Sequence, residues 1–462
     1  MPTEADARAP LAGRLRAAFA TGATRPLSWR REQVSGLARM LAKEAPQLTS
    51  AMGKDMGKPP VEAWLTDIAA VRRDVDAIVR HLDSWAAPRR VKVPWPLRPG
   101  RAQVVPEPLG AVLVIGPWNY PVRCAVLPLA FAIAAGNTAA LKPSELAPAT
   151  AEVLAGLLPT YLSPSTTVVA LGGPEVAREL LEQRWDHVFF TGGARAGRQV
   201  MAAAARHLTP VTLELGGKNP AIVDHTAEVD IAARRIAWGR FLNAGQTCVA
   251  PDYVLVDKRV EEQLVAALAK WARRFFGDDP RASSALARIV NDAHFQRLSE
   301  LLTKTGGQLV TGGSADAMQR YVAPTVLRDV SWDDPVMEEE IFGPILPVLP
   351  FASIDEVVAR VNERDKPLAL YLYSRDANAV ERVIAETSSG GVCVNHNTVQ
   401  LGVPGLPFGG VGASGMGAYH GQASFDTFSH AKAVLQRPMR GELPLVYPPY
   451  GRLKRWALRR AL

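Results

Sequence analysis

The sequence is poor in cysteine and lacks the usual spacings of metal ligands. Cys124, Cys248 and Cys393 are the three cysteines among 462 residues, and three thiols cannot all pair with one another. No CxxC pair occurs, and the histidines form no HxxxH or HExxH pattern. These absences argue against a disulfide framework and against a metal site. We therefore expect a protein of a reducing compartment that binds no metal.

Long apolar runs are also missing. The sequence contains no run of about 18 apolar residues, which is the length that a helix needs to cross a bilayer. The first residues lack the apolar core of a signal peptide, and Glu4 and Asp6 do not fit an acid-poor transit peptide. From these absences we expect a cytoplasmic protein.

Positive charge is in excess, but it is diffuse. Lys and Arg number 53 against 45 Asp and Glu, which gives a formal net charge of +8. Much of the excess lies in the N-terminal third and in the tail GRLKRWALRRAL, and no basic stripe is interleaved with aromatic residues. This distribution argues against a nucleic-acid partner. Clefts that bind an anionic cofactor would explain the charge equally well.

The sequence does contain a regular alternation of apolar strands and amphipathic helices. AVLVIG at 111–116 is a continuous apolar run, as expected for a strand covered on both faces. The pattern continues to VTLELGG and restarts after Lys218 with NPAIVD and YVLVD. Such alternation predicts βαβ units and parallel sheets. The fold class that we expect is α/β, with two doubly wound parallel-sheet domains.

Composition places the domain boundaries. The first domain is expected to combine residues 1–84 and 106–213, and the second to span 214–394. The proline-rich excursion around 85–105 is expected to be extended chain, as an edge strand with its turns. Within 395–436 we expect irregular chain followed by a short strand at AKAVL. Residues 437–462 form a basic C-terminal tail.

Two glycine-rich segments are candidates for a phosphate-binding turn. HVFFTGGARAGRQVM at 187–201 reads as a strand, a turn with Gly192 and a helix that contains Gly197. A glycine there lets the backbone approach a phosphate, although a plain strand-to-helix turn would look the same. The better match to GxGxxG, at Gly410, Gly412 and Gly415, neither follows a strand nor opens an apolar helix. We interpret that match as a tight loop packed against another element.

Several polar residues follow apolar strands, where open α/β sheets bind ligands. Asn119 and Tyr120 follow 111–116, and the Asn119 amide could either stabilise an oxyanion or cap the next helix. Lys142 and Glu145 follow TAALK, and they suit either a ribose and phosphate or a solvated loop. Glu214 ends VTLE inside an apolar strand, so it is either a carboxylate with a raised pKa, fit for a general base, or a partner of Lys218.

Cys248, in RFLNAGQTCVAP at 240–251, is by itself ambiguous. Most lone cysteines are small buried hydrophobes, and no histidine is an evident base for this one. The role of the three acids at 338–340 in VMEEEIFGP is also ambiguous. A run of charges is usually a solvated face, yet this one precedes an apolar segment that ends in proline.

The motifs together are far more specific than each alone. PWNYP (117–121), FTGG (190–193), ELGGK (214–218), GQTC (245–248), EEIFGP (339–344) and LPFGGVGASGMGAYHG (406–421) occur in this order. Over almost the full length the chain resembles the aldehyde dehydrogenase superfamily, and most of all its class 3 branch, which includes fatty-aldehyde enzymes. The resemblance implies a Rossmann-like NAD(P)-binding first domain and a catalytic second domain. It also implies that 85–105 and 395–436 form a small β element for oligomerisation, hence a homodimer.

The resemblance also implies a role for each candidate residue. Cys248 is the nucleophile, Glu214 the general base and Asn119 the side-chain oxyanion donor. The cofactor-binding positions are Trp118, Lys142, Glu145, Gly192, Gly197, Glu340 and Phe342. Ala194 and Arg195 follow the glycine turn where a hydroxyl would contact a phosphate, so that side-chain contact is absent.

The expected reaction is oxidation of an aldehyde to the carboxylic acid through a thiohemiacetal and a thioester on Cys248. Glu214 favours release by water over acylation of coenzyme A, and the presence of all key side chains disfavours an inactive binding scaffold. NAD is the expected cofactor, with NADP tolerated, because Glu145 would repel a 2′-phosphate and Lys142 would attract it. Apolar residues around Cys248 suggest aliphatic or aromatic aldehydes: Trp64, Tyr120, Trp238, Phe241 and Leu242, with Thr247 beside them. The basic tail, with Trp456, predicts at most a weak peripheral contact with membranes.

Overall fold

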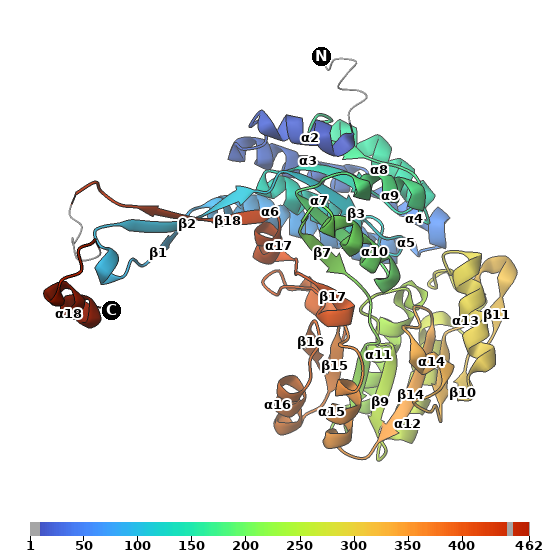
Figure 1. The fold of residues 1–462 in the computed structure, drawn as a ribbon. Coiled ribbons are helices and arrows are strands. Elements are labelled where there is room, and N and C mark those ends of the chain that lie inside the picture. Colours follow the sequence, from blue (N-terminus) through green and yellow to red (C-terminus); the bar gives the residue numbers. More distant parts are fainter. Residues whose placement is uncertain (1–9, 441–446, 462) are drawn as a thin grey trace.

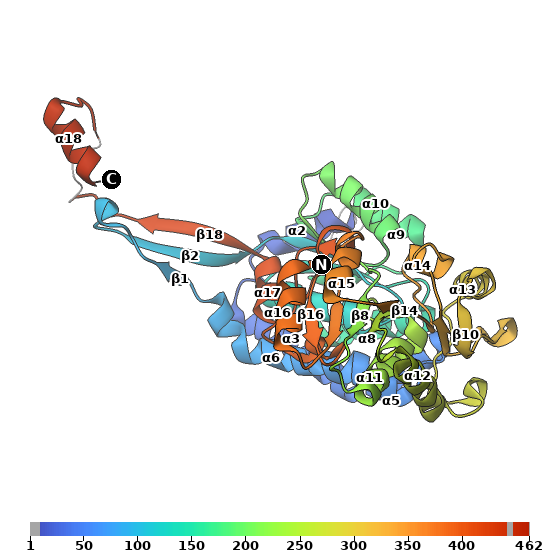
Figure 2. The same cartoon turned by 90° about the horizontal axis from the view of Figure 1, so that it is seen from below.

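The computed structural model describes residues 10–440 and 447–461. Two α/β bodies adjoin one another, and a long β arm extends from them and carries helix α18 at its end (Figures 1 and 2). Each body is built around its own sheet. The two parallel-sheet domains expected from the sequence are therefore confirmed.

Helices of the N-terminal segment pack on the first sheet. The apolar faces of α3, α4 and α6 share one core with β3, β4 and α7, whereas α2 packs on the other face of the sheet, where Leu15 shares a separate core with Leu113. The helices of this segment are α2 (Leu11–Ala20), α3 (Leu27–Lys43), α4 (Ala45–Met56), α5 (Pro60–Ala63), the π-helix η1 (Trp64–Ala69) and α6 (Ala70–Ala86).

The first sheet has the strand order β17-β7-β6-β3-β4-β5, and all pairs except β17–β7 are parallel. The order reverses between β3 and β6, and open sheets of this kind bind ligands at the carboxyl ends of such neighbouring strands. The strands are β3 (Ala111–Ile115), β4 (Thr138–Lys142), β5 (Thr167–Val169), β6 (His187–Thr191), β7 (Val211–Glu214) and β17 (Gly415–Met416). The helices between them are α7 (Arg123–Ala135), α8 (Pro148–Tyr161), α9 (Pro174–Glu182) and α10 (Ala194–Ala205).

The second sheet has the order β10-β13-β14-β9-β8-β15-β16, with β10 antiparallel to its neighbour. Its strands are β8 (Pro220–Val223), β9 (Tyr253–Asp257), β10 (Gln308–Thr311), β13 (Thr325–Arg328), β14 (Ile345–Phe351), β15 (Leu370–Tyr373) and β16 (Val392–Val394). Its helices are α11 (Val229–Phe241), η3 (Leu242–Gly245), α12 (Glu261–Phe276), α13 (Asp292–Lys304), α14 (Pro335–Glu338), α15 (Ile354–Asn362) and α16 (Ala377–Glu386). A small hairpin, β11 (Ala315–Asp316) and β12 (Tyr321–Val322), is added beside α13.

The arm consists of β1 (Arg89–Val91), β2 (Arg101–Pro108) and β18 (Ser429–Gln436), all antiparallel. The strand expected at AKAVL is longer than predicted, because it pairs with β2 along its whole length. The segment before it is less irregular than expected: β17 pairs with β7, and α17 (Gly421–Thr427) packs on α6 and α7. In the tail, α18 spans Arg452–Ala461.

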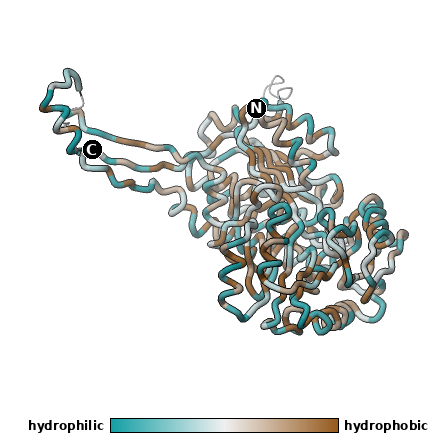
Figure 3. The backbone as a smooth tube through the Cα atoms, turned by 60° about the horizontal axis from the view of Figure 1, so that its bottom comes forward, coloured by the Kyte–Doolittle hydropathy of each residue, from teal (hydrophilic) through white to brown (hydrophobic). Residues whose placement is uncertain are grey.

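Hydrophobic residues concentrate inside the two bodies, whereas the arm mixes hydrophilic and hydrophobic residues (Figure 3). The strand β3 is buried along its whole length, as its apolar sequence predicts. Within the described residues, no helix combines the length and the hydropathy needed to span a membrane.

Candidate active site

The site lies where the carboxyl edge of the first sheet meets the loops before strands β9 and β14 of the second. The segment 116–122 leaves β3, and Cys248 precedes β9. Hydrogen bonds join these two segments directly: Asn119 Nδ2 donates to Gln246 O at 3.0 Å, and Tyr120 Oη and Thr247 Oγ1 are 2.6 Å apart. Residues that the sequence separates widely are thus brought together.

The loop that carries Cys248 is held in an unusual conformation. Asn243, Ala244 and Gly245 all have positive φ, at 52°, 52° and 74°. At Gly245 a Cβ atom would lie 2.1 Å from Gly343 O, so only glycine fits. Left-handed residues other than glycine are strained and cluster at functional sites.

Amide side chains fix this loop. Gln246 Nε2 donates to Asn243 O at 2.9 Å and to Arg288 O at 3.0 Å, while Gln246 Oε1 accepts from Val290 N at 3.0 Å. Asn219 Nδ2 donates to Cys248 O at 2.8 Å. The backbone around the thiol is therefore rigidly placed.

The Cys248 thiol lies in a desolvated setting. Burial, together with nearby Cys124 and then Glu340 and Glu214, raises the pKa of this thiol well above its usual range. A thiol of this kind needs a base before it can act as a nucleophile.

Asn119 is 5% exposed, and both its backbone and its side chain form hydrogen bonds with the loop of Cys248. Its carbonyl oxygen accepts from Asn243 Nδ2 at 3.0 Å, while its own amide donates to Gln246 O. Of the two N–H groups of this amide, one is used in that bond. The other N–H makes no further hydrogen bond among the described residues.

Glu214, at the end of β7, is 2% exposed, and neither carboxylate oxygen has a hydrogen-bond partner. Burial raises its pKa well above the usual range. The alternative that Glu214 pairs with Lys218 is wrong, because Lys218 Nζ binds Asp252 Oδ2 at 2.6 Å. A desolvated, unpaired carboxylate suits a general base.

The predicted pocket residues are only partly brought together. Tyr120 reaches Thr247, and the Trp238 ring lies 6.1 Å from that of His396. Phe241 is 1% exposed and packs on Phe276 in a core cluster that Cys248 also contacts, so its place beside a substrate tunnel stays a prediction.

Two further apolar residues of the predicted pocket, Trp64 and Leu242, lie on different elements. Trp64 is half exposed on η1. Leu242 follows the end of α11 directly, as the first residue of η3, and leads into the left-handed turn.

The turn after β6 has the features of a dinucleotide site. The helix α10 begins without a side-chain cap and without an acid in its first turn, so its first N–H groups are available to a phosphate. A Cβ on Gly197 would lie 2.8 Å from Leu215 Cδ2, which shows how closely α10 packs on the chain after β7. Arg195 is exposed. Gly192 N is bonded to Glu214 O, so this turn and the candidate base share a hydrogen bond.

Lys142 and Glu145 form an ion pair at the end of β4, with Lys142 3% exposed and the Glu145 side chain 35% exposed. The pair lies two strands from β6, on the same edge of the sheet. The observed strand order and the free start of α10 therefore fit a bound dinucleotide.

Glu340 and Phe342 approach the same edge from the second body. A Cβ on Gly216 would lie 2.0 Å from Glu340 Oε2, so the glycine makes room for this carboxylate. Burial of the carboxyl group, followed by nearby Asp252, raises the pKa of Glu340 to about 8. The Phe342 ring meets Trp118 edge-on at 5.4 Å, and the ring of His294 also lies 5.4 Å from that of Trp118.

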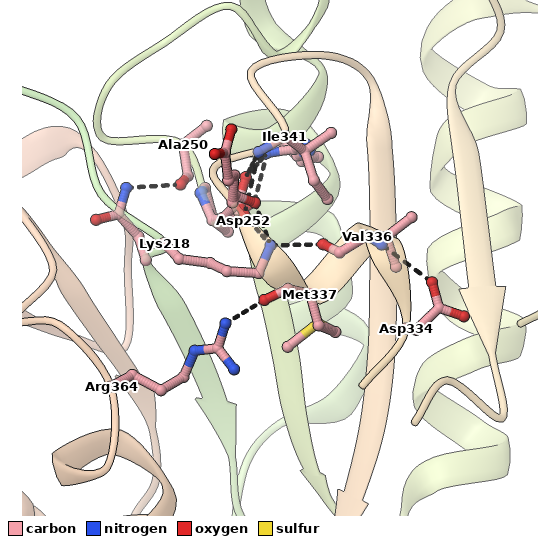
Figure 4. Close-up of polar contacts among 12 residues, drawn as sticks. Lys218, Ala250, Asp252, Asp334, Val336, Met337, Ile341 and Arg364 are labelled. Carbon is pink, nitrogen blue, oxygen red and sulfur yellow. Dashed lines mark hydrogen bonds and ion pairs between the residues drawn. The ribbon is translucent and has the colours of Figure 1, made fainter. Parts of the chain in front are cut away.

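A buried charge cluster holds the loop of Glu340 in place (Figure 4). Lys218 Nζ donates to Val336 O at 2.6 Å and to Glu339 O at 3.0 Å, and Asp252 Oδ1 accepts from Ile341 N at 3.1 Å. Arg240 completes the cluster with a bond to Asp252 Oδ1 at 3.0 Å. One cluster thus supports both the Cys248 loop and the Glu340 loop.

Reasoning from the sequence missed Lys58, Glu62 and Asp67, which lie beside the site. The pKa of Glu62 is raised to about 7 by burial, although Lys58 opposes this shift. Glu62 and Asp67 lie on helices and Lys58 lies in the turn before them; no motif marks this segment, and nothing in the spacing of the three residues signalled the site. No group of His, Cys, Asp and Glu residues suited to a metal ion occurs within 10–440 and 447–461.

The glycine-rich segment around Gly410, Gly412 and Gly415 is structural, as interpreted. β17 begins at Gly415, which pairs with Glu214 of β7. A Cβ on Gly415 would lie 2.1 Å from Leu213 O.

Known proteins similar to this chain are aldehyde dehydrogenases. Aldehyde dehydrogenase family 3 member B3 of Mus musculus is 48% identical over 451 residues, which cover 96% of this chain and 94% of the relative. The dimeric NADP-preferring aldehyde dehydrogenase of Canis lupus familiaris is 45% identical over 94% of this chain and 96% of its own length.

Solved structures agree with these relatives. Staphylococcus aureus AldH, in a substrate-bound state, superposes with a TM-score of 0.94 at 43% identity, covering 97% of this chain and 98% of that one. A mutant of the P. syringae indole-3-acetaldehyde dehydrogenase AldA, in complex with NAD+ and IAA, has a TM-score of 0.86 at 26% identity, covering 92% and 88%.

The sequence profile of the aldehyde dehydrogenase family matches residues 3–434, nearly the whole chain. With relatives at 48% identity and the geometry above, the chain belongs to the aldehyde dehydrogenase family and is an oxidoreductase that acts on aldehydes.

Proposed function

We propose that this enzyme oxidises aliphatic aldehydes of medium or long chain, or aromatic aldehydes, to carboxylic acids, and that water releases the acid. The observation that supports hydrolysis most is the Glu214 carboxylate, which is buried and has no hydrogen-bond partner. A carboxylate in that state can take a proton from water, whereas acylation of coenzyme A would not need it.

In the proposed reaction, the Cys248 sulfur adds to the aldehyde carbon after losing its proton. The free N–H of the Asn119 amide and the Cys248 backbone N–H stabilise the oxyanion of the thiohemiacetal. When bound, NAD supplies the acceptor for the hydride that leaves this carbon. The thioester that remains on Cys248 is attacked by water as Glu214 takes the proton, and the acid leaves with the sulfur as leaving group.

The residues at the carboxyl edge of the first sheet would hold NAD. The first turn of α10 would bind the pyrophosphate, Lys142 and Glu145 the adenosine ribose, and Glu340 the nicotinamide ribose. We propose a preference for NAD, with NADP tolerated, because the Glu145 carboxylate repels a 2′-phosphate. The P. syringae structure contains NAD+, whereas the canine relative is named NADP-preferring, so measured kcat/KM values for both cofactors are needed.

The decisive experiment measures acid and NADH formation over a series of aldehydes of increasing chain length, with and without coenzyme A. We expect turnover that rises with chain length and is independent of coenzyme A. Strict dependence on coenzyme A would favour the acylating alternative.

The variant Cys248→Ala serves as the control. It should form no acid yet still bind NAD, and wild-type turnover in this variant would contradict the mechanism.

We also propose a homodimer formed through the arm. β1 and β18 are the edge strands of that small sheet, and unpaired edges are natural sites for pairing with another chain. The canine relative is named dimeric. Light scattering should give twice the monomer mass, and deletion of 429–436 should abolish the dimer.

We further propose a cytoplasmic enzyme whose tail contacts membranes weakly. On α18, Leu453 and Trp456 are exposed next to basic residues such as Arg459 and Arg460. Such a helix binds anionic lipid through charge and a small apolar face. Vesicles with anionic lipid should sediment the full chain and not a chain truncated at residue 440.

A further inference from the structure

A buried ion pair from the N-terminal helices lies behind the segment that carries Asn119. Lys58 lies in the turn between α4 and α5, Asp67 lies in η1, and neither side chain has exposed surface. Lys58 Nζ is 2.7 Å from Asp67 Oδ2. A buried ion pair is rarely needed for stability, because apolar side chains of the same volume often serve as well. The pair therefore calls for an explanation beyond folding.

Lys58 contacts the segment between β3 and α7 at two points. Its Nζ donates to Asn119 O at 3.3 Å and lies 3.9 Å from the centre of the Tyr120 ring. A cation this close to an aromatic face is attracted to it. Since Asn119 O also accepts from Asn243 Nδ2, the peptide group of Asn119 is held between Lys58 and the Cys248 loop.

Asp67 fixes the end of the same segment. Its Oδ1 accepts from the backbone N–H groups of Val122 and Arg123, at 3.3 and 3.1 Å, at the start of α7. These are N–H groups that the helix itself leaves without partners. Asp67 belongs to a π-helical turn. Such turns are rare in proteins, and those that occur are often found at functional sites.

We propose that Lys58 and Asp67 are positioning residues that hold the Asn119 amide and Tyr120 in register with Cys248. The inference rests on the proposed function, since it takes the Asn119 amide as the oxyanion donor. The ion pair fixes the backbone from behind, and the amide then needs no reorganisation when charge develops on the substrate oxygen. A misplacement of about 1 Å in such a donor can cost about 100-fold in rate.

The test variant combines Lys58→Met with Asp67→Asn. Both charges are removed together, so no unpaired charge is left in the interior, and the new amide oxygen can still accept from Val122 and Arg123. Lys58→Gln with Asp67→Asn is the conservative version, because it keeps a neutral donor for the Asn119 carbonyl.

The matched control is Asp55→Asn. Asp55 is also buried, lies on α4, and accepts from Ala149 and Thr150 N at the start of α8; none of its hydrogen bonds reaches segment 116–122 or the loop of Cys248.

Two reactions are measured: aldehyde oxidation with NAD, and hydrolysis of an activated ester without NAD. Both develop an oxyanion on a carbonyl bound to Cys248. In the Lys58→Met version we expect both kcat values to fall together, by about 10- to 100-fold. The NAD dissociation constant, followed by tryptophan fluorescence, should stay unchanged. The Lys58→Gln version should lie between this variant and the wild type.

Two results would overturn the inference. One is a wild-type rate in the folded variant that combines Lys58→Met with Asp67→Asn. The other is a loss no larger than that of Asp55→Asn at equal melting temperature. A wild type that hydrolyses the ester yet forms no acid from any aldehyde would contradict the proposed function instead.

Discussion

The side-chain amide of Asn119 donates a hydrogen bond to the backbone carbonyl of Gln246 across 3.0 Å, although the two residues belong to loops of different sheets. This bond joins the two bodies at the point where the chemistry is expected. It sets the direction of the remaining N–H of the amide, and so determines where an oxyanion would be stabilised.

Removing that donor should slow the reaction without unfolding the protein. We expect Asn119→Ala to lower kcat for aldehyde oxidation by about 100- to 1,000-fold, the usual cost of one oxyanion donor. Steady-state kinetics measure this loss, and circular dichroism checks the fold. Asn362→Ala is the control, because the Asn362 amide also bonds a backbone carbonyl, that of Glu386, but on the surface.

The raised pKa of Glu214 predicts how stability depends on pH. A carboxyl group whose pKa is raised by folding favours the folded state only while it is protonated. The contribution of Glu214 to the stability of the fold is therefore fully present below about pH 4.3, its pKa in the unfolded chain. That contribution is lost as the pH rises through its raised pKa in the folded protein. We expect Glu214→Gln to raise the melting temperature at pH 7 and to change it little at pH 4.

Glu182→Gln is the opposite case, because the pKa of Glu182 is lowered by its hydrogen bond to Arg206. This variant should give no gain in melting temperature at pH 7. A loss of stability at pH 7 in Glu214→Gln would contradict the argument.

Glu145 is expected to set the choice of cofactor. Its carboxylate pairs with Lys142, so removing its charge leaves the lysine free to meet a 2′-phosphate. Glu145→Gln should raise kcat/KM with NADP relative to that with NAD by about 5- to 10-fold, which corresponds to about 1 to 1.4 kcal/mol. Lys142→Met should have the reverse effect, and an unchanged ratio in both variants would exclude this pair from cofactor selection.

The buried cluster around Asp252 should matter for stability far more than an exposed pair. Asp252→Asn leaves Lys218 and Arg240 buried without a negative partner, and the expected loss is about 3 to 5 kcal/mol. Chemical denaturation measures this loss. Asp230→Asn removes the partner of Lys270, but both side chains are more than half exposed, so a loss of at most about 1 kcal/mol is expected.

Much of the fold could be predicted because its signals are local. The apolar run of β3 is buried on both faces, and the strand-to-helix turn at Gly192 is short, so neither depends on distant partners. The pairing of Lys58 with Asp67 and the contact of Lys218 with Asp252 arise only when helices and loops dock. No periodicity in the sequence encodes such docking.

The site shows the same division. Cys248 could be named from GQTC and its companions, yet the left-handed run that presents it, from Asn243 to Gly245, has no sequence signature beyond its glycine. Phe241 could be placed on the helix before Cys248, but the contact of its ring with Phe276 depends on how that helix packs in the second body, which the sequence does not encode.

The pairing of β17 with β7 has a consequence for synthesis of the chain. During translation β7 is made long before Gly415 and Met416, so the strand that ends in Glu214 stays an open edge while the whole second body emerges from the ribosome. α17 and β18, which pack on the first body and its arm, arrive later still. Glu214 therefore gains its finished surroundings only near the end of synthesis, and we expect a ribosome-bound chain that lacks the residues after 394 to be inactive.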